Sequence, residues 1–221
     1  MTKHLVRDLE VLKKEILGIG ALVEDAIHMA TSALLDRRPE FAEAVIHGDV
    51  EIDTREVAIE EECLKILALH QPVAFDLRFI ITVLKVNNDL ERMGDLAVNI
   101  AERAGYLSQH PPLDRPRGFN RMVEQVRAMV DKSLNALVEQ DTDLAHEVLR
   151  ADDEVDATHR EMFSHMQAAM TADPANIVRA THLLSASRNL ERIADQATNI
   201  AEDVLFMVDG EIIRHRKIRA Q

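Results

Sequence analysis

One long stretch of the chain occurs twice, and most of what is repeated is polar. DLERMGDLAVNIAE at residues 89–102 returns as NLERIADQATNIAE at residues 189–202, without a gap and at a constant offset of 100. Nine of the fourteen positions are identical, among them Glu, Arg, Asp and Asn. Packing alone would preserve the apolar positions and let the polar ones change. The repeat therefore indicates a fold of two similar halves, with a second constraint on its polar residues.

The rest of the chain has the periodicity of amphipathic helices. Three prolines and a glycine mark 108–118 as a linker. The periodicity predicts helices over 2–35, 39–69, 73–107, 119–140, 141–170 and 175–208. Because short connections make long helices antiparallel neighbours, we expect an all-α fold of two tandem up-down three-helix bundles related by internal duplication. The bundles would span 1–107 and 119–208, followed by a C-terminal tail, 209–221.

Composition supports this fold class and limits the partners. The chain has 7 Gly and 6 Pro, and 47% of its residues are hydrophobic, which favours helices over a turn-rich sheet fold. The net charge of −13 and the 3% aromatic content argue against binding to nucleic acid, which attracts basic surfaces and aromatic platforms. A cation or a basic protein partner suits this charge better.

The single cysteine and the N-terminal sequence bear on the compartment. Cys63 is alone, so it cannot form an internal disulfide, and we expect it to be a core residue. The first eighteen residues alternate charged and apolar side chains, unlike a signal peptide. The most apolar run, 79–84, is too short to cross a bilayer. We expect a cytoplasmic protein that meets membranes only through its partners.

Carboxylates spaced four residues apart recur on two helices of each half. On a helical wheel they lie beside the apolar arc, not within it. The pairs are Asp49 with Asp53, Glu91 with Asp95, Asp152 with Asp156, and Glu191 with Asp195. Adjacent helices of a bundle could bring two such pairs together in each half.

Like charges at this spacing repel unless something positive lies between them. Carboxylate oxygens favour hard cations, so we expect metal ions here: iron, manganese, magnesium or zinc. Where the first half has Glu56 the second has His159, which makes the two sites unequal. The alternative interpretation is a solvated face in which Arg92 and Arg192 form salt bridges with neighbouring carboxylates. This interpretation does not explain why the same carboxylate spacing recurs on four helices, two in each half.

Three functions are compatible with these patterns. The first is a non-enzymatic regulator that binds metal and partner proteins. The second is a carboxylate metalloenzyme of the di-iron type, although such sites use Glu-x-x-His motifs inside a bundle. The third is a metal-free structural adaptor. The sequence has no nucleophile constellation and no glycine-rich phosphate loop, so we expect a protein without enzymatic activity.

Five segments of the sequence form a specific combination of motifs. They are GDVEIDTREVAIEEE (48–62), QPVAFDLR (71–78), NDLERMGDLAVNIAE (88–102), RNLERIADQATNIAE (188–202) and VDGEIIRH (208–215). Together they resemble the PhoU family of bacterial phosphate-signalling regulators. The resemblance covers almost the whole chain, and the pairing of QPVAFDLR with a following LERMGD is highly specific.

The resemblance implies tandem three-helix bundles, commonly assembled as a homodimer, and metal clusters held by E/D-x-x-x-D motifs at the eight carboxylates. It also implies a negative regulator of phosphate uptake and of the phosphate-starvation response. Such a regulator links the phosphate ABC transporter (Pst), through its ATPase, to a sensor histidine kinase (PhoR). DPANIVRA replaces QPVAFDLR in the second half, so any role of that turn belongs to the first. We expect Arg78 in this motif to form a surface or inter-helix salt bridge.

Overall fold

The computed structural model describes residues 3–116 and 118–210. Six α-helices and one 3₁₀ turn make up its secondary structure, and no strand occurs in these ranges. In chain order they are α1 (Lys3–Asp36), α2 (Pro39–His70), α3 (Ala74–Ser108), α4 (Gly118–Glu139), α5 (Thr142–Ala172), η1 (Pro174–Asn176) and α6 (Ile177–Asp209). The all-α tandem-bundle prediction is confirmed. Most of the predicted 209–221 tail lies outside the described residues.

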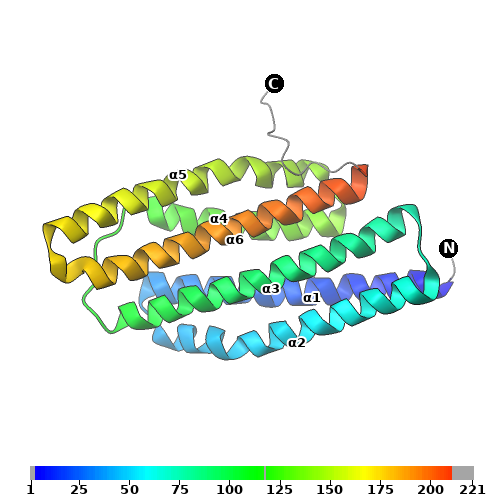
Figure 1. Ribbon diagram of the computed structural model, residues 1–221, viewed down its shortest axis with the longest axis horizontal. Coiled ribbons are helices and arrows are strands. Elements are labelled where there is room, and N and C mark those ends of the chain that lie inside the picture. The colour runs from blue at the N-terminus through cyan, green and yellow to red at the C-terminus, as the bar shows by residue number, and fades with distance from the viewer. Residues whose placement is uncertain (1–2, 117, 211–221) are drawn as a thin grey trace, which may run out of the picture.

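Short turns reverse the chain between helices, so neighbours within each half are antiparallel (Figure 1). The first turn follows α1 at Arg37, and Pro39 begins α2 at a first-turn position that needs no backbone N–H. α2 ends at His70 and is capped by Gln71, which has φ 45° and donates its N–H to the Leu67 carbonyl. α5 runs two residues further than predicted, to Ala172. Asp173 then accepts a hydrogen bond from Ala175 N and starts the 3₁₀ turn.

Two arginines hold the connection between the halves, which is non-helical over 109–116. Arg37 donates from Nη2 to the Ser108 carbonyl at 2.9 Å. Arg179 donates from Nη1 to the Pro111 carbonyl at 3.0 Å. The predicted linker is thus tied to the ends of α1 and α6.

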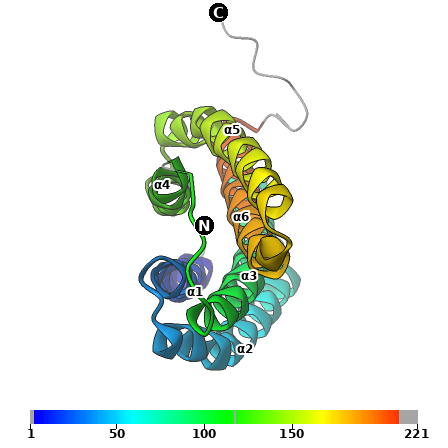
Figure 2. The same cartoon turned by 90° about the vertical axis from the view of Figure 1, so that its left-hand side faces the viewer.

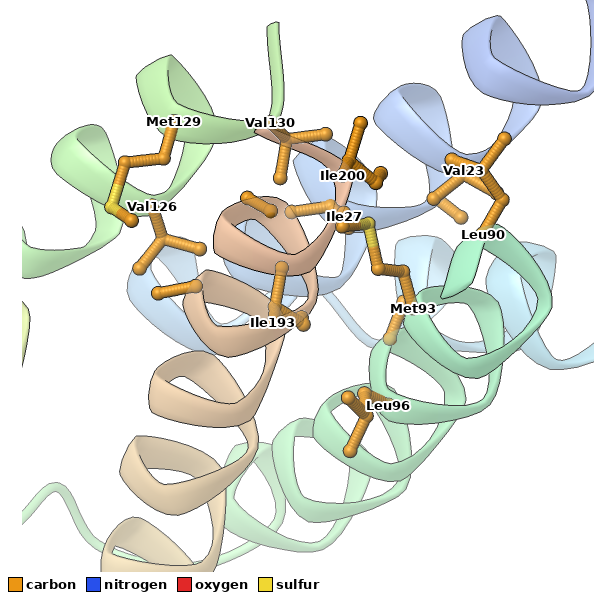
Figure 3. Packing of buried hydrophobic residues seen from close by; sticks show 14 of the residues in the cluster. Val23, Ile27, Leu90, Met93, Leu96, Val126, Met129, Val130, Ile193 and Ile200 are labelled. Carbon is orange, nitrogen blue, oxygen red and sulfur yellow. The ribbon is translucent and has the colours of Figure 1, made fainter. Parts of the chain in front are cut away.

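The two bundles pack side by side and share one hydrophobic core. α3 lies along α6, and α1 approaches α4 (Figure 2). Aliphatic side chains of both halves meet at this contact, as Figure 3 shows for Val23, Leu90, Met93, Val130 and Ile193. All five are fully buried. Burial at this scale is the main stabilising contribution to the fold.

Polar groups also cross between the halves. Lys85 of α3 forms an ion pair with Asp203 of α6, with Nζ and Oδ1 2.8 Å apart. Tyr106 stacks on His182 with ring centroids 3.9 Å apart. Arg127 of α4 donates from Nε to the hydroxyl of Thr31 in α1, at 3.0 Å. These directional contacts fix the register of one bundle on the other.

Within the described chain, α1 alone has the length and hydropathy of a membrane-spanning helix. The most apolar run of the sequence, 79–84, lies in α3 and therefore did not point to α1. Half of its most apolar stretch is buried, where α1 packs against α2, α3 and α4. The apolar residues of α1 are therefore explained by its place in the core. Cys63 is likewise fully buried, as predicted.

Candidate metal centre

The eight predicted carboxylates lie on two pairs of adjacent antiparallel helices, α2 with α3 and α5 with α6. They flank the core-facing residues, as the periodicity indicated. In the first bundle Asp49 and Glu91 are half-buried, whereas Asp53 and Asp95 are exposed. We call Asp49, Asp53, Glu91 and Asp95 the α2–α3 cluster, and Asp152, Asp156, Glu191 and Asp195 the α5–α6 cluster.

In the α2–α3 cluster, carboxylates of one helix perturb those of the other. Burial raises the pKa of Asp49, and the charges of Asp53 and Asp95 raise it further. The pKa of Glu91 is also raised by burial, and then by Asp95, Asp53 and Glu56. Because each side chain feels charges from the opposite helix, the two acidic pairs face each other across the α2–α3 contact.

The α5–α6 cluster has the same arrangement with stronger effects. Burial, followed by the charges of Asp195 and Asp156, raises the pKa of Asp152 to about 6. The pKa of Glu191 is raised by burial and then by Asp195 and Asp156. Burial and Asp156 raise the pKa of Asp195. The duplicated sequence thus places the second set of carboxylates in the same relation as the first.

Salt bridges do not neutralise these clusters. Within 3–116 and 118–210, Asp156 with Arg160 is the one ion pair that involves any of the eight carboxylates, at 3.6 Å. Arg92 and Arg192, which the alternative interpretation paired with them, are exposed and form no ion pair in the same ranges. The salt bridges of the alternative interpretation are therefore not formed by these two arginines in the described ranges. The charge of Arg92 still opposes the rise in the pKa of Glu91, and that of Arg192 opposes the rise for Glu191 and Asp195.

Small and polar residues of α3 allow α2 to approach closely beside the cluster. A Cβ on Gly94 would lie 3.2 Å from Ile52 Cδ1 and 3.4 Å from Asp49 Oδ1. The buried amide of Asn87 donates from Nδ2 to the Glu56 carbonyl at 2.8 Å. Gly94 therefore lets Asp49 lie directly against α3, next to the face that carries Glu91 and Asp95.

The donor chemistry of both clusters fits a hard cation: four carboxylates, partly desolvated and mutually repelling. Their spacing is wider than coordination requires, because no group of three or more His, Cys, Asp or Glu side chains in the described chain is close enough to hold a metal. A shared cation would therefore need side-chain rotation toward the centre of each cluster.

His159 does not take over the acidic role of Glu56. Its Nδ1 lies 2.9 Å from the hydroxyl of Ser187, and burial lowers its pKa, which favours the neutral ring. Ser187 is the counterpart of Asn87, which binds Glu56 through the backbone instead. The equivalent contact between neighbouring helices is thus made by Glu56 with Asn87 in the first half and by His159 with Ser187 in the second.

Arg78 differs from the expectation of a salt bridge. Its Nε donates to the Met207 carbonyl at 2.9 Å, and its guanidinium lies against Gly210, which ends α6 with φ 76°. A cation at a helix C-terminus satisfies a free carbonyl and complements the helix dipole. The QPVAFDLR motif therefore links the start of α3 to the end of α6.

A polar groove between α3 and α6 was not predicted from the sequence. Its volume is about 570 Å³, and its lining includes Lys85, Asn88, Asp89, Arg92, Asn199 and Glu202. Three of these, Arg92, Asn199 and Glu202, lie at positions that are identical in both copies of the repeated stretch and do not belong to the predicted metal set. The groove could have been suspected from the sequence, because these polar residues are repeated although the predicted metal sites do not use them.

The fold and the acidic clusters define a duplicated all-α protein of tandem three-helix bundles. The model of the PhoU domain matches residues 16–104 and 119–204. A relative from Aquifex aeolicus named phosphate-specific transport system accessory protein PhoU homolog is 44% identical, covering 97% of each chain. One of the same name from Pseudomonas aeruginosa is 39% identical, over 97% of this chain and 91% of that one.

Solved structures agree with the sequence comparison. The crystal structure of PhoU from Pseudomonas aeruginosa has a TM-score of 0.88 and 38% identity, over 93% of this chain and 99% of that one. The phosphate transport system regulatory protein PhoU from Streptococcus pneumoniae has a TM-score of 0.87 and 29% identity, over 94% and 98%. The chain belongs to the PhoU family.

The raised pKa of Asp152 predicts a pH-dependent stability of the metal-free protein. A carboxyl whose pKa is higher in the folded state than the usual 3.8 stabilises the fold at low pH, and that contribution is lost as the pH rises through about 6. The upper limit is about 3 kcal/mol, which partial exposure reduces to about 1–2 kcal/mol. We expect Asp152→Asn to remove this loss. Urea unfolding in a chelator at pH 4 to 7 measures it, and a parallel pH profile for variant and wild type would contradict the assignment.

Proposed function

We propose that this protein is a metal-binding accessory protein of phosphate-specific transport. In this proposal it restrains phosphate uptake and the phosphate-starvation response when phosphate is plentiful. It acts in the cytoplasm as a homodimer and links the ATPase of the phosphate transporter to a sensor histidine kinase. The observation that supports the regulatory role is near-full-length identity of 44% to a relative named as an accessory protein of that system.

The metal part of the proposal rests on the two acidic clusters. Asp49, Asp53, Glu91 and Asp95 would hold a cation in the first bundle, and Asp152, Asp156, Glu191 and Asp195 would hold one in the second. Iron, manganese, magnesium or zinc bound there would neutralise the repulsion and join neighbouring helices. The protein itself provides oxygen ligands, partial desolvation and a close α2–α3 contact at Gly94.

A regulatory role fits the position of these clusters better than a di-iron oxidase does. Di-iron carboxylate sites lie inside a bundle and are lined by groups from four helices. Here each cluster uses two helices and lies beside the core, with Asp53, Asp95 and Asp195 exposed. A metal bound in such a cluster would hold two helices in place at a surface that partner proteins can contact. An exposed cluster of this kind does not enclose a substrate.

A pull-down tests the regulatory proposal directly. The full chain, immobilised on beads, is incubated with detergent-treated lysates of cells grown at high and at low phosphate. We expect the transporter ATPase and a histidine kinase to be retained, in amounts that depend on phosphate supply. Retention of neither protein under both conditions would contradict the proposal. An oxygen-consumption assay on iron-loaded protein tests the oxidase alternative, for which we expect no activity.

A further inference from the structure

The two outer helices, α2 and α5, are duplicates whose inner faces agree and whose outer faces do not. At an offset of 103, every α2 residue buried in the first bundle up to Cys63 has a buried apolar counterpart in α5. The pairs are Ala42/Ala145, Val45/Val148, Ile52/Val155, Ile59/Met162 and Cys63/Met166. The fold therefore imposes the same inner pattern on both helices.

At three exposed positions α2 has a large aliphatic residue where α5 has a polar one. Val50, Val57 and Leu64 of α2 are 68%, 52% and 55% exposed, and their α5 counterparts are Asp153, Arg160 and Gln167. Since α5 folds with polar residues at these positions, the fold does not require aliphatic ones. The three side chains of α2 need another explanation.

Val50, Val57 and Leu64 are seven residues apart and form one line along α2, which we call the α2 stripe. Ile46, also exposed, extends it by one turn. From Val50 to Leu64 the stripe is about 21 Å long, at 1.5 Å per residue. A seven-residue apolar repeat along an exposed helix is the pattern by which one helix binds another. Among the helices of 3–116 and 118–210, α2 lies at the outside of the molecule (Figures 1 and 2), and the exposed fractions show that no other described helix covers the stripe.

Acidic residues flank the α2 stripe on both sides. On a helical wheel with Val50 at zero, the stripe extends to about 40° on one side. Asp53 and Glu60 lie beyond it at about 60–80° on that side, and Glu43 and Glu61 lie at about 20° on the other. All four are exposed, and none forms an ion pair with another residue of the described chain. Over its whole length α2 carries nine Asp or Glu and two Lys or Arg. The stripe is thus an apolar seam within a strongly negative surface.

We propose that the outer face of α2 is a docking site for a basic amphipathic helix of a partner protein. The partner helix would place aliphatic side chains on the α2 stripe and Lys or Arg beside the flanking carboxylates. A second copy of α2 does not fit, because two surfaces of the same strong negative charge would repel each other. The proposal does not depend on a role in phosphate transport, and of the four flanking carboxylates only Asp53 belongs to a metal cluster.

A binding assay with a synthetic peptide tests this proposal. The probe is an 18-residue fluorescein-labelled helical peptide with Leu at its a and d positions and Lys or Arg at e and g. We expect it to bind the full-length protein, and to bind at least tenfold more weakly to the variant with Val50→Asp, Val57→Arg and Leu64→Gln, which introduces the α5 residues. The matched control replaces Asp153, Arg160 and Gln167 of α5 with Ala and should leave the affinity unchanged. Raising the salt concentration should weaken binding, because the flanking charges are exposed.

Three outcomes would overturn the proposal. The first is equal affinity of the peptide for wild type and for the α2 variant, at unchanged helicity. The second is a wild-type dimer in sedimentation velocity that the α2 variant converts to monomer, since the face would then be a self-interface. The third is peptide binding that appears only after Arg214, Arg216, Lys217 and Arg219 are replaced with Gln, since the occupant would then be the chain's own C-terminal segment. None of these results would contradict the regulatory or metal proposals.

Discussion

Replacing Glu91 and Asp95 with Ala is expected to abolish metal binding at the α2–α3 cluster while the α5–α6 cluster stays loaded. Both side chains lie beside the core, so their loss removes two of the four carboxylates without opening a cavity. The remaining Asp49 and Asp53 belong to one helix and leave a cation without ligands from the other. Elemental analysis of the purified variant should therefore show about half the metal of the wild type, with unchanged far-UV circular dichroism.

The matched control uses acidic residues of the same molecule that belong to neither cluster. Glu43 and Glu61 of α2 are exposed, and replacing both with Ala changes the net charge by the same amount. We expect this control to keep the full metal content. Undiminished metal in the Glu91 and Asp95 variant, or an equal decrease in the control, would show that the ions are held elsewhere or only by overall charge.

Replacing Lys85 with Met is expected to lower the free energy of unfolding by about 2–3 kcal/mol. The side chain of Asp203 is 2% exposed, and Lys85 forms its ion pair across the α3–α6 contact. Replacing Lys85 takes a positive charge away from beside a desolvated carboxylate, and losing one member of a buried ion pair costs more than the pair contributes. The half-exposed position of Lys85 places the expected cost below that of a fully buried pair. Urea unfolding at pH 7 measures it.

Lys65→Met provides the comparison for this prediction. Lys65 pairs with Glu62 at the same 2.8 Å, but within one helix and at the surface, where a pair contributes less than about 1 kcal/mol. The two variants lose the same type of interaction in different surroundings. Similar unfolding free energies for both would mean that the α3–α6 contact does not depend on its buried carboxylate.

The helices could be predicted from the sequence because their boundaries depend on local signals. Pro39 and the Gln71-Pro72 pair act within one turn of the chain, and each predicted helix ends within a few residues of the observed one. The duplication added a check within the sequence, since two halves with the same apolar pattern must have the same packing. The expected positions of the eight carboxylates beside the core followed from the same periodicity.

The contacts between the halves could not be predicted in the same way. Which face of α3 meets α6 depends on the relative orientation of two bundles, and no local pattern encodes that orientation. The ion pair of Lys85 with Asp203, the bond of Arg78 to the Met207 carbonyl and the groove beside Arg92 all arise there. The pairing of His159 with Ser187 was missed for a related reason. The structural effect of having His159 in place of Glu56 depends on the residue that faces it on the next helix, which the sequence alone does not show.

The most direct test of the metal proposal is elemental analysis of the untagged wild-type protein. The protein is stripped with a chelator, exposed in turn to iron, manganese, magnesium and zinc, and freed of unbound metal by gel filtration. Two occupied clusters in each chain, with at least one of these metals, is the result that we predict. A protein that remains metal-free after all four exposures would contradict the assignment of Asp49, Asp53, Glu91, Asp95 and their second-half counterparts as metal ligands.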